Sequence, residues 1–110
     1  MPQYMLLLHH DPSGWHKLSP EEQAKAHEKY MAWTKKALDS KQLAPEGGRV
    51  IRPGNGQPRI SDGPYSETKE MLGGYYTIEA ASYDQAVQRA LEHPHLRYGG
   101  TIEVRHVFGS

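Results

Sequence analysis

A strand followed by a helix with a serine cap occurs twice in this chain, and this arrangement constrains the fold more than any other feature. The first strand is the apolar run QYMLLLH at 3–9, and Ser19 is expected to cap the first helix. Pro20 suits the first helical position, and Glu22 completes a capping box with Ser19. On a helical wheel the apolar side chains share one face, so we expect this helix to run to about Lys41.

The second strand and capped helix lie in the C-terminal half. The run GGYYTIEA at 73–80 is rich in aromatic and β-branched residues, which predicts a strand with alternate side chains on opposite faces. Ser82 is expected to cap a helix that ends before Pro94, and the alternating segment TIEVRHVF at 101–108 predicts the last strand. The inward face of this second helix is expected to consist of Tyr83, Ala86, Val87, Ala90 and Leu91.

Two further short strands flank the turn sequence PGNG at 53–56 and predict a hairpin. The order is then strand, helix, hairpin, strand, helix, strand. It predicts an α+β fold, a ferredoxin-like βαββαβ sandwich with an inserted hairpin, in which an antiparallel sheet carries both helices on one face. The other face of the sheet needs a cover, and a second subunit is the expected one.

Composition limits the core and the choice of partner. The 110 residues suit a single domain spanning 1–110, and a mean hydropathy of −0.80 with 36% apolar residues leaves it a lean core. Seven tyrosines, two tryptophans and one phenylalanine therefore favour a homodimer interface. The 13 acidic and 13 basic residues leave no excess charge for nucleic acid. The absence of cysteine fits a cytoplasmic location, and the N-terminal apolar run is too short to span a membrane.

The stretch SDGPYSETKE at 61–70 is dense in charged and hydroxyl side chains. One interpretation is a turn started by Asp62 whose charges are only solvated. A second is a loop that bends over a small-molecule pocket, with Asp62 as an acceptor, Tyr65 as a stacking surface and Glu67 or Lys69 as polar contacts. A third is a dimer contact. We predict a turn that also acts as a lid, anchored by a hydrogen bond from the Asp62 side chain to the backbone.

Histidines gather in HHDPSGWH at 9–16. Adjacent strand residues face opposite ways, so His9 and His10 cannot bind one metal ion while the strand continues. We therefore expect no metal site, and the sequence shows no cofactor motif. If the protein is an enzyme, we expect acid/base chemistry on a small polar metabolite by His9 or His10 with Asp62, because histidine titrates near neutrality. The histidines of HPH at 93–95 are expected to close the second helix, where positive charge suits the helix dipole.

Two tyrosines complete the candidate ligand-binding residues. Tyr30 lies on the apolar face of the first helix, either in the core or in a pocket wall where its hydroxyl reaches polar groups. Tyr76 lies on one of the two faces of the central strand, and parity does not decide which. We predict that both bind a ligand, together with Tyr65 and Lys69. The alternative class is a non-catalytic ligand-binding or regulatory protein, which a pocket without a histidine–carboxylate hydrogen bond would favour.

Several stretches together resemble the YCII-related family, in its DGPF-domain branch: YMLLLHHD, LDSKQLAPEG, DGPYSETKEMLGGYYTIEA, YDQAVQRALEHP and GGTIEVRHV. Tyr65 stands where that branch usually has phenylalanine. The resemblance implies a bacterial cytoplasmic protein, a ferredoxin-like subunit of a dimeric α/β barrel, and no established reaction. Shorter members have been proposed to be enzymes with a His–Asp pair, and the corresponding positions here are Tyr30 and His93, so we do not carry the pair over. Relatives that accompany extracytoplasmic-type sigma factors imply a regulatory role as the alternative.

Overall fold

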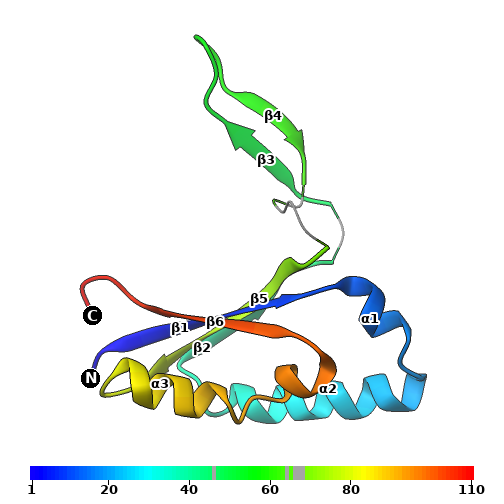
Figure 1. Ribbon diagram of the computed structural model, residues 1–110, viewed down its shortest axis with the longest axis vertical. Helices are drawn as coiled ribbons and strands as arrows, with labels where there is room; N and C mark the ends of the chain where they lie inside the picture. Colours follow the sequence, from blue (N-terminus) through cyan, green and yellow to red (C-terminus); the bar gives the residue numbers. More distant parts are fainter. Residues whose placement is uncertain (46, 64, 66–68) are drawn as a thin grey trace.

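The computed structural model describes residues 1–45, 47–63, 65 and 69–110. A four-stranded antiparallel sheet packs against helices, and a two-stranded hairpin projects away from it (Figure 1). The elements in chain order are β1 (Gln3–His10), α1 (Pro12–His16), α2 (Pro20–Thr34), β2 (Asp39–Gln42), β3 (Arg49–Arg52), β4 (Arg59–Asp62), β5 (Met71–Glu79), α3 (Tyr83–Ala90), the 3₁₀ helix η1 (Pro94–Tyr98) and β6 (Thr101–His106).

The main sheet has the strand order β2-β5-β1-β6, in which β1 pairs with both β5 and β6. At its centre Leu6 lies opposite Tyr76 on one neighbour and Val104 on the other. Helices α2 and α3 lie on the same side of this sheet (Figure 1). This arrangement confirms the predicted α+β ferredoxin-like topology with an inserted hairpin.

The core lies between this sheet and the helices. Alternate residues of β1 and β5 are buried there, and Leu6 and Ile78 have no exposed surface. Burying a side chain of that size contributes about 2 kcal/mol. The helices add Trp33 from α2 and the small residues Ala86 and Ala90 from α3, which let the α3 backbone approach the sheet. The opposite face of the sheet is less buried, since Met5 is only partly covered.

Serine caps start both predicted helices. The Ser19 Oγ accepts a hydrogen bond from the Glu22 backbone N–H at 3.1 Å, and the Glu22 carboxylate accepts one from the Ser19 N–H at 3.1 Å. Ser82 accepts from the Gln85 N–H at 3.2 Å. These bonds satisfy backbone donors that the first turn of a helix leaves without partners. Both predicted helix starts are confirmed.

The predicted end of the first helix is wrong. Helix α2 ends at Thr34, residues 35–38 form a turn, and β2 begins at Asp39, within the segment expected to be helical. The Leu38 N–H donates to the Thr77 carbonyl at 2.8 Å, and Asp39 then pairs with Thr77 across the ladder. Because the edge of β5 offers unpaired backbone groups, pairing with it outweighs the apolar periodicity of the helix.

The C-terminal helix also differs from the prediction in two respects. Ala86 and Ala90 are buried as expected, whereas Tyr83, Val87 and Leu91 are exposed. The HPH segment does not close α3, because that helix ends at Ala90 and His93 caps a separate 3₁₀ helix, η1. Pro94 fits the first position of the new helix, where its missing N–H costs no hydrogen bond.

The predicted hairpin is confirmed as β3 and β4, with Ile51 opposite Ile60 and Arg49 opposite Asp62. It extends beyond the Met71 end of β5 and away from the helices (Figure 1). Ile51 and Ile60 are 68% and 70% exposed, so the hairpin adds little to the core. Among the helices of the described residues, none combines the length and apolarity needed to cross a lipid bilayer.

Candidate functional site

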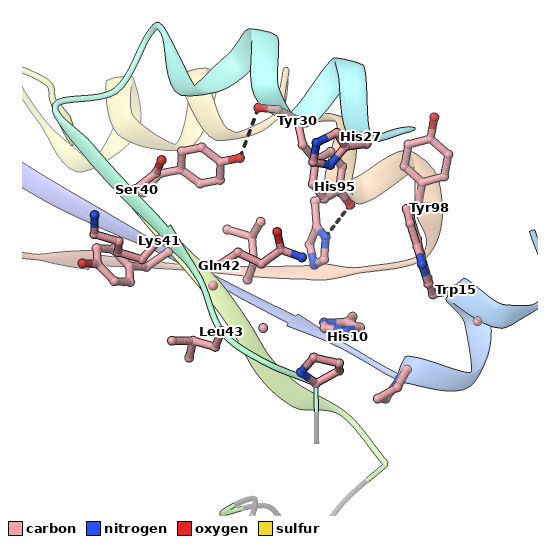
Figure 2. Close-up of a pocket in the computed structure, with 18 of the residues that line it drawn as sticks. His10, Trp15, His27, Tyr30, Ser40, Lys41, Gln42, Leu43, His95 and Tyr98 are labelled. Carbon is pink, nitrogen blue, oxygen red and sulfur yellow. Dashed lines mark hydrogen bonds between the residues drawn. The ribbon is translucent and has the colours of Figure 1, made fainter. Parts of the chain in front are cut away.

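A cavity of about 530 Å³ opens between the sheet and the helices. Its size falls within the range of small-molecule sites. Helix α1 forms one end, α2 and η1 form one side, and β2 and β5 form another (Figure 2). The side chains discussed below that line it are His10, Asp11, Trp15, Tyr30, Tyr76, His95 and Tyr98.

A chain of hydrogen bonds crosses the wall of this cavity. The Tyr30 hydroxyl lies 2.8 Å from His95 Nδ1, and His95 Nε2 lies 2.8 Å from the His9 backbone carbonyl oxygen. A carbonyl oxygen can only accept, so Nε2 of His95 bears the proton. The bare Nδ1 of the neutral ring then accepts the Tyr30 proton. We call this arrangement the Tyr30–His95–His9 chain, and its first bond is drawn in Figure 2.

Burial keeps both side chains of this pair uncharged. The pKa of His95 is lowered chiefly by burial, which outweighs the opposing effect of its bond to the His9 carbonyl. Burial also raises the pKa of the Tyr30 hydroxyl well above its usual range. A buried histidine disfavours its cation and a buried tyrosine its anion. At neutral pH the pair therefore consists of a neutral imidazole and a protonated phenol.

His93 supports this wall from behind. Its Nδ1 accepts the His95 backbone N–H at 3.0 Å, and its ring packs on Trp33 and Tyr76, with ring centroids 4.8 and 4.7 Å away. The side chain is 1% exposed, and burial lowers its pKa to about 4. Within the described part of the chain, its Nε2 has no hydrogen-bond partner. His93 is therefore held neutral by aromatic packing.

Two glycines leave room for the cavity histidines. A Cβ atom at Gly100 would collide with the His95 ring, and one at Gly73 would collide with the His10 ring. Both rings therefore lie directly against backbone, which restricts the positions they can adopt. His10 and His95 also contact each other edge to face, with ring centroids 6.1 Å apart.

Three of the residues predicted from the sequence meet at this cavity: His10, Tyr30 and Tyr76 all line it. The Tyr76 hydroxyl donates to the Tyr30 carbonyl at 3.4 Å, which links β5 to α2. The side chain of His9 is not among the lining residues, and its Nε2 lies 3.3 Å from Glu103 on β6. His9 therefore contributes its backbone carbonyl to the site.

The structure does not bring the other predicted residues to the cavity. Asp62 is in β4, with its side chain 92% exposed and 3.8 Å from Arg49. Tyr65 is 76% exposed, with the Arg52 guanidinium 5.3 Å from its ring centroid. Lys69 is exposed as well. Glu67 lies outside the described residues, as do residues 64, 66 and 68, so the lid stays a prediction.

Lys69 does not line the cavity, but its charge contributes to the lowered pKa of Asp11, which does. Asp11 lines the cavity and caps α1, where its side chain accepts the Ser13 backbone N–H at 3.0 Å. That hydrogen bond is the main cause of the lowered pKa of Asp11, and the positive charges of Lys69 and Lys17 lower it further. The Asp11 carboxylate is thus ionised at the α1 end of the cavity.

Three residues that line the cavity, His95, Trp15 and Tyr98, were not predicted from the sequence as site residues. His95 and Tyr98 lie on η1, directly after His93. The only signal for them was that Tyr30 and His93 stand at the positions of the His–Asp pair proposed for shorter relatives. Those two positions do meet in the structure, with ring centroids 5.4 Å apart. Among the described residues, no group of three or more histidine and acidic side chains is placed to hold a metal ion.

The topology and cavity together define an α+β protein of ferredoxin-like plan with a small-molecule-sized site between sheet and helices. The chain belongs to the YCII-related family, whose domain model matches residues 2–109. A protein of Rhizobium meliloti strain 1021 is similar to it, with 32% identity over 94 residues, covering 79% of this chain and 76% of that protein. The relative is itself named only as uncharacterised.

Proposed function

We propose that this YCII-related protein binds a small metabolite in the cavity, with the polar group of the metabolite placed against Tyr30. The observation that supports this most is the Tyr30–His95–His9 chain in the wall of a cavity of about 530 Å³. Small-molecule sites typically combine apolar walls with a few fixed polar groups. Trp15 and Tyr98 supply aromatic surface, and the hydrogen-bonded pair supplies the fixed polar group.

Binding is favoured over acid/base catalysis by the partners of the histidines. His9 contacts the carboxylate of Glu103, but neither of these side chains lines the cavity. Near His95 the carboxylate of Glu70 raises the pKa of that histidine, although burial outweighs it. His95 instead pairs with a tyrosine, and burial disfavours its cation. Because Tyr30 and His95 are both uncharged, the pair can hydrogen-bond a ligand group without a proton being transferred.

Proton transfer is the second candidate, and the direct bond between Tyr30 and His95 supports it. A ligand O–H or N–H could pass its proton to the Tyr30 oxygen while the Tyr30 proton moves to His95 Nδ1. The product would be a ligand anion and an imidazolium still bonded to the His9 carbonyl. Because burial lowers the pKa of His95, this imidazolium is costly, and we expect such a step to be slow.

The two tryptophans allow binding to be tested by fluorescence. Trp15 lines the cavity, whereas Trp33 is 4% exposed in the core. We expect a bound aromatic fragment to quench the wild type and Trp33→Phe, and to leave Trp15→Phe nearly unquenched. Quenching that persists in Trp15→Phe would place binding elsewhere, and its absence for every member of an aromatic fragment set would contradict a small-molecule site.

A homodimer is proposed as well. Its support is the outer face of the sheet, where Met5, Leu7 and Tyr75 are partly exposed and no helix of the described chain packs. Light scattering should give about twice the 12.4 kDa mass of the chain, and a monomer at micromolar concentration would contradict this. Four further proposals rest on the sequence features and the resemblance. They are a single domain, membership in the DGPF branch, a bacterial cytoplasmic location and a sigma-factor partner.

A further inference from the structure

We propose that the ligand of this cavity presents a hydroxyl or N–H hydrogen-bond donor to the Tyr30 oxygen, and that ligands presenting only acceptors there, such as carboxylates or ethers, are disfavoured. This inference rests on the proposed binding function and adds the chemical class of the ligand. It follows from the direction of each hydrogen bond in the Tyr30–His95–His9 chain.

The direction of these hydrogen bonds is set by the bond between His95 and the His9 carbonyl. The His9 carbonyl cannot donate, so His95 Nε2, 2.8 Å away, must. Rotating the imidazole by half a turn would place C–H groups at both the His9 carbonyl and the Tyr30 hydroxyl, and both hydrogen bonds would be lost. The ring also lies against Gly100, where even a Cβ atom would collide with it. The orientation of His95 is therefore fixed by its surroundings.

The fixed orientation of His95 determines where the hydroxyl proton of Tyr30 points. With Nε2 protonated and the ring neutral, Nδ1 has a lone pair and no proton. The Tyr30 hydroxyl, 2.8 Å away, is the donor to that lone pair. A phenol has one proton, so what Tyr30 can offer the cavity is the remaining acceptor capacity of its oxygen. Tyr30 is thus an acceptor toward any ligand.

A ligand that offers only an acceptor meets a mismatch here. To donate to it, Tyr30 would have to turn its proton away from His95 and leave Nδ1, on a side chain 4% exposed, without a partner. An unsatisfied buried acceptor weakens binding by about fivefold or more. A hydroxyl or N–H group pairs with the Tyr30 oxygen without disturbing the chain.

Phenol, anisole and benzoate test this inference because they share one aromatic ring and differ in the polar group. Titrations of ¹⁵N-labelled protein near pH 7.5 would follow the amides of Gly73, Gly74 and Gly100. We expect phenol to bind about three- to tenfold more tightly than anisole, which is the range of one net hydrogen bond, and benzoate to bind most weakly. Tyr30→Phe should remove the preference for phenol and retain anisole binding, while Tyr83→Phe, at a tyrosine that does not line the cavity, should behave as the wild type.

The outcomes separate this inference from the proposed function. Equal affinities for the three probes, or a preference for benzoate, would overturn the donor rule while cavity binding stands. If no probe shifts the cavity amides, the binding function fails and the inference fails with it. The ¹⁵N chemical shifts of the His95 ring give an independent check without ligand: protonation at Nδ1 in place of Nε2 would overturn the inference directly.

Discussion

The cavity wall and the β3–β4 hairpin both contain polar and aromatic side chains, but the contacts that hold those side chains differ. His95 is 4% exposed and bonds to groups 65 and 86 residues away in the sequence. Asp62 is 92% exposed, and Arg49, directly opposite it on β3, lies 3.8 Å away. A buried hydrogen bond is expensive to break, whereas an exposed ion pair contributes little. Long-range buried contacts therefore identify the candidate site, whereas the density of polar residues in the sequence does not.

The largest effect that we expect from this comparison is a loss of stability in acid, caused by His93. Its pKa is about 4 in the folded chain because of burial, against 6.5 as the ordinary value. The unfolded chain therefore binds the proton first as the pH falls. The contribution of neutral His93 to the free energy of unfolding is complete above pH 6.5 and is lost between pH 6.5 and about 4, by about 3 kcal/mol.

Urea unfolding at several pH values measures this loss, and His93→Asn is the matched control. Asparagine can still accept the His95 N–H at the cap but does not titrate. The difference in unfolding free energy between wild type and variant should shrink as the pH falls, even though carboxylates such as Asp11 and Glu22 add their own acid sensitivity to both proteins. A difference that is constant from pH 7 to pH 4 would show that His93 is not held neutral.

The second effect concerns the space around His95. Gly100→Ala places a Cβ atom where the His95 ring lies, so we expect a loss of about 2 kcal/mol, typical of overpacking, together with altered ¹⁵N shifts of that ring. Gly14→Ala is the control, because a Cβ atom there meets nothing within 4 Å. Thermal or urea unfolding of both variants measures the difference. Equal stability of the two would mean that the close approach of Gly100 to His95 is not maintained in solution.

These contacts also explain how much could be predicted from the sequence. The capping box of α2, the serine cap of α3 and the hairpin turn depend on residues a few positions apart, and the fold built from them was correct. The end of α2 was wrong because pairing with β5 decides it, and that strand lies about 40 residues further on. His10, Tyr30 and Tyr76 were predicted from the sequence as site residues, and all three line the cavity. His95 was not predicted, because its two hydrogen-bond partners are distant in the sequence. Local patterns indicate elements, but they do not show which side chains meet.

The smallest effect should come from Asp62, and it tests the other half of the comparison. If the carboxylate only forms the exposed ion pair with Arg49, Asp62→Ala should change the free energy of unfolding by a few tenths of a kcal/mol. If it anchors a turn through a backbone hydrogen bond, as the lid hypothesis requires, the cost should be about 1 kcal/mol. We expect the smaller value, because the side chain is 92% exposed.

Amide exchange in residues 62–70 separates the two hypotheses further, with Arg49→Ala as the control that removes the same ion pair from the opposite strand. An ion pair alone predicts that both substitutions have equally small effects and that exchange in the loop is unchanged. An anchor predicts faster exchange in Asp62→Ala only. Slower exchange of the wild-type loop when phenol occupies the cavity would show that the hairpin and the cavity act together, and the contrast between the two regions would then hold only for the ligand-free protein.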